Sequence, residues 1–185
     1  MRRSMLAALA FAFFLAAPLS AQSVELGLNG GFGKYLGDDF EDSEVGFGVG
    51  GHLLFGEGDA RFGAGVDYAS YGEEGLEEKM GALDLFGLFR YMLPGESARF
   101  FVGGKAGFSR LSADVMDISI SAKGFGVGPV AGVQIPLEAL AVEISGDVQY
   151  VSYGDVEGEG ETIEGSDSSG FEAGVRVGIA VPLGG

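Results

Sequence analysis

The sequence predicts an all-β fold: an eight-stranded antiparallel up-and-down transmembrane β-barrel with a lumen filled by charged side chains. Three observations lead to this prediction. Eight segments of about ten residues or more alternate apolar residues with small or polar ones, which is the period of a β-strand. The connections between these segments alternate between long and short, as in closed meanders. All 27 acidic residues fall in connections or on the polar faces of the segments.

The segment 171–183 shows the alternation most clearly, and in a closed barrel it pairs with the first strand. Its odd positions, from Phe171 to Leu183, are all apolar. The even positions are Glu172, Gly174, Arg176, Gly178, Ala180 and Pro182. A soluble sheet normally sets polar residues opposite its apolar face. Small residues opposite an apolar row instead indicate a crowded interior and an exterior that faces lipid.

Seven further strands precede this one. They are expected at 24–34, 45–55, 61–71, 80–92, 99–111, 125–135 and 140–153. Ten residues tilted by about 45° span roughly the 25 Å apolar band of an outer membrane. The short connections, 56–60, 94–98 and 136–139, are expected in the periplasm together with both termini. The four long connections, 36–44, 72–79, 112–124 and 154–170, are expected outside the cell.

Irregular stretches lead to four local predictions. Segment 80–92 is apolar on both faces, and we expect Asp84 and Arg90 to face inward because lipid would penalise their charges. Alternating Ile and Ser after position 117 indicate that the strands around 112–124 extend, with a bulge near Lys123. Pro129 cannot donate to a ladder and predicts a second bulge. The Gly- and Ser-rich stretch 154–170, with six carboxylates, is predicted to be a mobile loop.

The N-terminus predicts a secretory signal peptide, residues 1–21, followed by one β-barrel domain, residues 22–185. Arg2 and Arg3 precede an apolar run of about 13 residues, shorter than the ~20 that a spanning helix needs. Removing these two arginines leaves 9 of the 11 basic residues against 27 acidic ones, a net charge of −18. Such acidity argues against nucleic acid or anionic surfaces as partners. There is no cysteine, so no disulfide supports the fold.

Ten charged residues are expected to point into the lumen and to form an ion-pair network that fills it. They are Glu25, Arg61, Asp67, Asp84, Arg90, Lys105, Glu143, Asp147, Glu172 and Arg176. Aromatic residues near strand ends are expected to form interfacial girdles, although Trp is absent. The girdle set is Tyr35, Phe55, Tyr68, Tyr91, Phe100, Phe108, Tyr150 and Phe171.

Three segments of the sequence resemble those of a known family: residues 46–51 (GFGVGG), residues 101–109 (FVGGKAGFS) and the strand 171–183. With them the chain from about 24 to 183 resembles the small outer-membrane β-barrel proteins of the OmpA/OmpX-like, porin-family superfamily. The resemblance implies a cell outer membrane location, contact with outer-membrane lipid and lipopolysaccharide, and assembly by the barrel-assembly machinery. Family members typically end on an aromatic residue, whereas this sequence reads Leu183-Gly184-Gly185.

The sequence does not predict an enzyme, a cofactor or a metal site. Barrels of this size that are enzymes would be expected to combine His with Ser or Asp, and His52 is the only histidine, with no adjacent Ser or acid. We therefore expect His52 to belong to the lumen network. The acidic connection 38–44 lacks the ligand spacing of a calcium loop.

These observations favour a non-enzymatic outer-membrane barrel with a structural or surface-interaction role, a closed lumen and acidic extracellular loops. We expect it to be a monomer with an extracellular partner that the loops alone do not identify. One alternative is a narrow channel or transporter for small or hydrophobic molecules, against which the inward charges argue. The other is an exported soluble ligand-binding barrel, which would need an apolar interior.

Overall fold

The computed structural model describes residues 23–41, 43–72, 79–115, 118–158, 161–163 and 168–183. Within them lie nine strands and one short 3-10 helix. In order these are β1 (Ser23–Leu36), η1 (Asp38–Phe40), β2 (Gly46–Gly56), β3 (Ala60–Gly72), β4 (Lys79–Leu93), β5 (Arg99–Val115), β6 (Ile118–Pro136), β7 (Ala141–Gly158), β8 (Glu161–Ile163) and β9 (Ser168–Pro182). The expected signal peptide lies outside the described residues.

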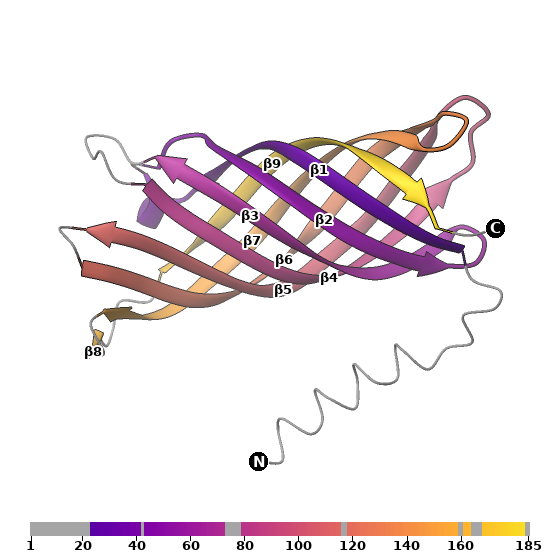
Figure 1. Cartoon of the computed structure of the whole chain (residues 1–185). Coiled ribbons are helices and arrows are strands. Elements are labelled where there is room, and N and C mark those ends of the chain that lie inside the picture. The colour runs from indigo at the N-terminus through magenta and orange to yellow at the C-terminus, as the bar shows by residue number, and fades with distance from the viewer. Residues whose placement is uncertain are drawn as a thin grey trace, which may run out of the picture.

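Eight antiparallel strands close into a barrel, as the sequence predicts (Figure 1). Strands β1 to β7 pair with their neighbours in sequence, and β9 pairs with both β7 and β1. The ladder between β1 and β9 runs from Glu25 opposite Pro182 to Leu36 opposite Phe171, so the first and last strands of the barrel are paired along their length. Among the described residues, closure leaves none of the eight barrel strands as an open edge, which is what a sheet surrounded by lipid requires.

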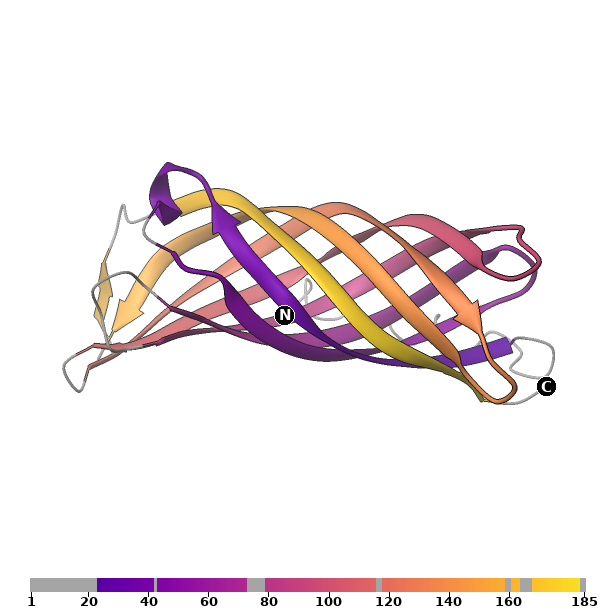
Figure 2. The same cartoon turned by 90° about the horizontal axis from the view of Figure 1, so that it is seen from above.

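The two ends of the barrel differ. The connections Gly56–Ala60, Leu93–Arg99 and Pro136–Ala141 lie at one end together with Ser23 and Pro182, and we call it the short-turn end. The other end, the long-loop end, carries η1 and the extended tips of β5, β6 and β7 (Figure 2). The described residues contain no helix with the length and hydropathy needed to cross a membrane.

The strand faces have the predicted orientation, and β4 is the decisive case. Leu83 and Leu85 are 41% and 56% exposed, whereas Asp84 and Arg90 are 6% and 3% exposed. Apolar side chains are therefore exposed on the outer surface while charged ones are buried in the lumen. This inverts the arrangement of a soluble barrel and suits a lipid exterior.

Glycines on the lumen face give the larger lumen side chains room. Gly65 of β3 lies opposite Phe86 of β4, and a Cβ built on Gly65 would come within 2.6 Å of the Phe86 ring. Real Cβ atoms essentially never approach so closely, so a side chain here would displace the ring. At this position glycine therefore serves close packing inside a narrow barrel.

One predicted bulge is present and the other is wrong. The register between β6 and β7 shifts between Ala122 and Gly124, with the extra residue on β7, which confirms the bulge expected near Lys123. At Pro129 the β5 ladder continues in step and the β7 register is the same on both sides, so no bulge forms. Pro129 only interrupts the pairing with β7, because a proline has no N–H to donate to that ladder.

The prediction of a mobile loop over 154–170 is also wrong for part of that stretch. Strand β7 continues to Gly158, opposite Ile120 of the extended β6, and then pairs with β8. Strand β9 already begins at Ser168. The extension of β6 supplies backbone partners that a polar sequence alone does not reveal, and these bonds turn much of the stretch into a hairpin beyond the barrel rim (Figures 1 and 2).

Candidate functional site

A bidentate ion pair lies in the lumen towards the short-turn end. Arg90 donates from Nη1 and Nη2 to the two carboxylate oxygens of Glu143, at 2.6 and 2.9 Å. The Arg90 guanidinium carbon also lies 4.2 Å from the centre of the Phe101 ring. Gln134, which is fully buried, donates a further hydrogen bond of 3.0 Å to Glu143. Strands β4, β5, β6 and β7 are thereby linked across the interior.

A second group of four charges occupies the middle of the lumen. Arg176 of β9 lies 3.0 Å from oxygens of both Asp67 and Asp147, and Lys105 of β5 lies 2.8 Å from Asp147. Lys105 also lies 3.9 Å from Asp67. Two cations and two carboxylates from β3, β5, β7 and β9 therefore neutralise one another where water is largely excluded. Such a group is stable only because each charge has a partner.

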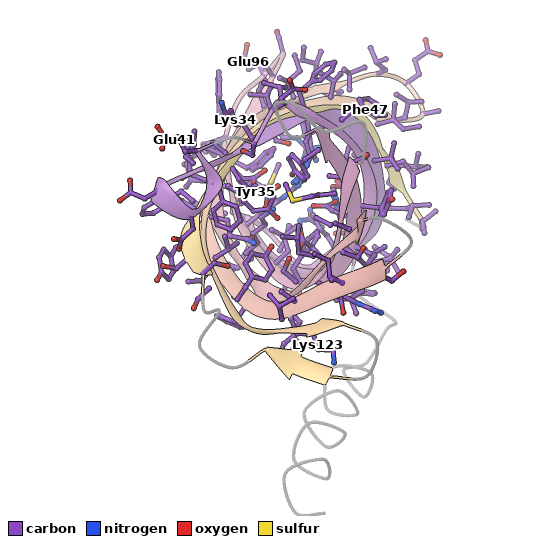
Figure 3. The ribbon with its side chains drawn as sticks, turned by 90° about the vertical axis from the view of Figure 1, so that its left-hand side faces the viewer. Lys34, Tyr35, Glu41, Phe47, Glu96 and Lys123 are labelled. Carbon is purple, nitrogen blue, oxygen red and sulfur yellow. The ribbon has the colours of Figure 1, made fainter. Side chains whose placement is uncertain are left out.

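Tyrosines fill the lumen towards the long-loop end. The Tyr35 and Tyr153 hydroxyls are 2.8 Å apart, and Tyr153 is 2.9 Å from Ser109 Oγ. Tyr71 donates a 2.8 Å hydrogen bond to Glu172. Assigning Tyr35 to an interfacial girdle was therefore wrong, because its side chain is completely buried and points inside the ring of strands, whereas Phe47 points outside (Figure 3). Consecutive residues of a β-strand face opposite sides of the sheet. Tyr35 of β1 therefore lies on the same inward face as Gly33.

The helix η1 covers this end of the lumen. Its Phe40 is 8% exposed and stacks on Tyr35 with ring centres 4.9 Å apart. The neighbouring Asp39 accepts a 2.8 Å hydrogen bond from the backbone N–H of Ser169, at the start of β9. One apolar residue of the acidic connection 36–44 therefore covers the tyrosines at this mouth of the lumen.

The ten residues predicted for the lumen network fall into different surroundings. The structure joins Asp67, Arg90, Lys105, Glu143, Asp147 and Arg176 in ion pairs. Glu172 is held by Tyr71, and Asp84 is buried opposite Ser109 in the β4–β5 ladder. Glu25 accepts a hydrogen bond from Gln134. Arg61 has neutral partners, the Ser23 hydroxyl and the Gly56 carbonyl, at the short-turn mouth.

Sequence reasoning missed the polar and aromatic partners of these charges. Gln134, Tyr71, Tyr153 and Phe40 all connect strands or close the lumen. Gln134 and Tyr153 occupy inward positions in the predicted alternation, and that signal could have identified them. Nothing in the sequence places Phe40, because it lies between carboxylates in a connection.

Solved structures with the same architecture have low sequence identity to this chain. Neisserial surface protein A of Neisseria is 15% identical with a TM-score of 0.66, and the match covers 89% of this chain and 100% of that one. A major outer membrane protein from Thermus thermophilus is 15% identical with a TM-score of 0.57, covering 88% and 100%. No curated protein matches the chain. These likenesses show the fold alone.

The model of one protein family covers most of the sequence. It is described as the outer membrane protein beta-barrel domain, and it matches residues 6–178. Together with the closed eight-stranded barrel and its apolar exterior, the match also decides the location and excludes the soluble alternative. The chain belongs to the outer membrane protein β-barrel domain family and is a protein of the bacterial outer membrane.

Proposed function

We propose that this outer-membrane barrel is a non-enzymatic protein with a structural or surface-interaction role and a closed lumen. The proposal rests on the layers of side chains that follow one another through the interior of the barrel. The Arg90–Glu143 pair, the four charges around Arg176 and the tyrosines below Phe40 succeed one another from the short-turn end to the long-loop end. Each layer joins strands from different sides of the barrel.

These layers argue against the channel alternative. A pore needs a continuous path of water past its lining, whereas Arg90, Lys105 and Tyr153 are each 3% exposed or less. Buried apolar side chains, including Leu88, Phe101 and Val130, also occupy the interior. Eight strands enclose an interior that side chains of this size can fill.

The surroundings of His52 support a non-enzymatic role. Among the described residues, His52 Nε2 has no hydrogen-bond partner, so no serine hydroxyl is positioned to give it a proton. The imidazole is 5% exposed inside the lumen, where a substrate has no open approach. General-base catalysis requires both a nucleophile within hydrogen-bond reach and access for a substrate.

A planar bilayer measurement tests closure of the lumen. Protein refolded in detergent and inserted into a bilayer should give no stepwise conductance, because no water-filled path crosses the ion-pair layers. A general porin refolded in the same detergent serves as the positive control. Regular conductance steps that scale with the amount of this protein would overturn the proposal and establish the channel alternative.

The exterior near the long-loop end supports a contact with phosphorylated outer-leaflet lipid. Arg110 of β5 and Lys123 of β6 are exposed and lie directly opposite each other in the ladder. Next to them on the same face, Phe108 and Phe125 form an edge-to-face pair with ring centres 6.1 Å apart. Adjacent cations above an aromatic pair suit a lipid whose phosphate lies at the interface and whose chains lie below it.

Replacing both cations by glutamine should weaken binding of a bisphosphorylated lipid several-fold, because two attractive charges are lost from one site. Native mass spectrometry of the refolded protein with increasing lipid measures this binding. Lys34→Gln is the matched control, since Lys34 is an outward-facing cation of β1 without a cation opposite it. Equal loss in Lys34→Gln would show that total charge, not this pair, governs the contact.

A further inference from the structure

We propose that Glu25, His52 and Glu143 bind one Zn²⁺ ion in the lumen near the short-turn end. The three residues come from β1, β2 and β7, and the possible ligand atoms all lie within 4.8 Å of one another. In a tetrahedral zinc site, two ligands at about 2.0–2.2 Å from the metal lie about 3.3–3.6 Å apart, so these side chains must move together by up to about 1 Å when the ion binds. No sequence motif indicates this site, because its ligands lie on three strands far apart in the chain.

The first argument is the state of His52. Its side chain is 5% exposed, yet Nε2 has no hydrogen-bond partner among the described residues. A buried polar atom without a partner costs free energy, and such an atom in a native structure calls for an explanation. The lone pair of a neutral imidazole nitrogen is a common zinc ligand. A metal at Nε2 would therefore supply the missing partner.

The second argument is the convergence of two carboxylates. Gln134 Nε2 donates at 3.0 Å to Glu25 Oε1 and also at 3.0 Å to Glu143 Oε2, so one donor holds both acids together. Gln134 is 0% exposed, and its Oε1 has no partner among the described residues. Rotating the amide by half a turn would exchange Nε2 for Oε1 and offer a fourth ligand to a cation between the carboxylates.

The donor set favours zinc over the hard cations. One imidazole nitrogen and two carboxylates form the kind of three-ligand set that binds Zn²⁺ with a fourth position left for water or an amide oxygen. Calcium would require six to eight oxygens, and these residues do not supply them. Arg90 keeps its 2.9 Å hydrogen bond to Glu143 Oε1 when Oε2 turns to the metal, and so orients that ligand.

A backbone feature leaves space for the imidazole. Gly27 of β1 lies opposite His52 in the β1–β2 ladder, and a Cβ built on Gly27 would overlap the imidazole ring. Glycine at this position therefore allows His52 to lie over β1 beside Glu25. Bound zinc would tie the β1–β2 hairpin to β7 across the lumen and stabilise the closed barrel by mass action. This inference does not depend on the proposed surface role.

The histidine count allows a direct test. His52 is the only histidine of the chain, so protein refolded without a polyhistidine tag and labelled with ¹⁵N-histidine gives the nitrogen signals of one imidazole. Adding Zn²⁺ in the presence of excess Ca²⁺, which competes for exposed carboxylates, should shift the imidazole nitrogen signals until one equivalent is bound. An imidazole spectrum unchanged by a tenfold excess of Zn²⁺ would overturn the proposal.

Two variants and a matched control identify the ligands. His52→Gln and Glu25→Gln should each weaken the one-equivalent Zn²⁺ affinity at least tenfold in calorimetry. Glu172→Gln removes a buried lumen carboxylate that Tyr71 holds near the other end, and should leave the affinity unchanged. Heat-modifiable gel migration verifies that each variant has folded. If His52→Gln does not fold, Glu25→Gln decides, and unchanged affinity in that variant would refute the site.

Discussion

Replacing Arg90 by methionine should lower the free energy of unfolding by about 3–5 kcal/mol, because the substitution leaves a buried carboxylate without its partner. Glu143 is 5% exposed and accepts both guanidinium hydrogen bonds, so no solvent replaces them. The protein contains no Trp, and urea unfolding in lipid vesicles is therefore best followed by far-UV circular dichroism together with gel mobility. EDTA in all samples removes any contribution from bound metal.

The double variant Arg90→Met with Glu143→Leu separates the loss of the pair from the cost of an orphaned charge. It removes both buried charges, so we expect it to recover most of the stability that Arg90→Met loses. The methionine and leucine would pack against Phe101 and Val130, which already form an apolar cluster beside the pair. A double variant as unstable as the single one would show that Arg90 contributes mainly through packing.

Period-two alternation, together with the alternating long and short connections and the placement of the acidic residues, predicts the barrel, because both the lipid and the lumen act on the residues of every strand. A residue that faces lipid must be apolar, and one that faces a narrow lumen must be small or find a partner. Even β4, apolar on both faces, could be oriented from the cost of placing Asp84 and Arg90 in lipid. Strand faces therefore follow from local sequence and two environments.

Partners in the lumen could not be predicted in the same way. Arg90 and Glu143 are 53 residues apart, and Tyr35 and Tyr153 are 118 apart. Which inward residues meet depends on the tilt and stagger of the strands, which shift neighbouring strands relative to each other. The alternation of apolar and polar residues does not reveal the size of that shift. Arg61 illustrates the limit, since it faces inward as predicted but its partners are a hydroxyl and a carbonyl.

The long connections were the least predictable part for a related reason. Phe40 closes the lumen only because Tyr35 and Tyr153 lie beneath it, with ring centres 4.9 and 6.2 Å away. The hairpin of β7 and β8 forms only because β6 extends beyond the rim. Both features depend on contacts between segments, whereas local composition indicated only acidic connections.

Replacing Val177 by arginine should lower the free energy of unfolding by about 2–4 kcal/mol in lipid vesicles, the cost of a cation at the midplane of a barrel's lipid face. Val177 is 54% exposed and lies between Gly30 of β1 and Ile144 of β7. It is six residues from both Phe171 and Leu183, near the centre of the last strand. Urea unfolding with the same circular dichroism and gel readouts measures the change.

Val45→Arg is the matched control, because Val45 is also an exposed apolar residue, 63% exposed, but precedes β2 at the long-loop rim. Near the interface the same charge should cost only about 0–1 kcal/mol. The adjacent residue in the native sequence, Arg176, already carries a guanidinium, which faces inward and contacts Asp67 and Asp147 at 3.0 Å. An arginine at position 177 would thus face hydrocarbon, whereas the arginine at position 176 faces two buried carboxylates. Equal stability of Val177→Arg and Val45→Arg would mean that membrane depth does not govern this face.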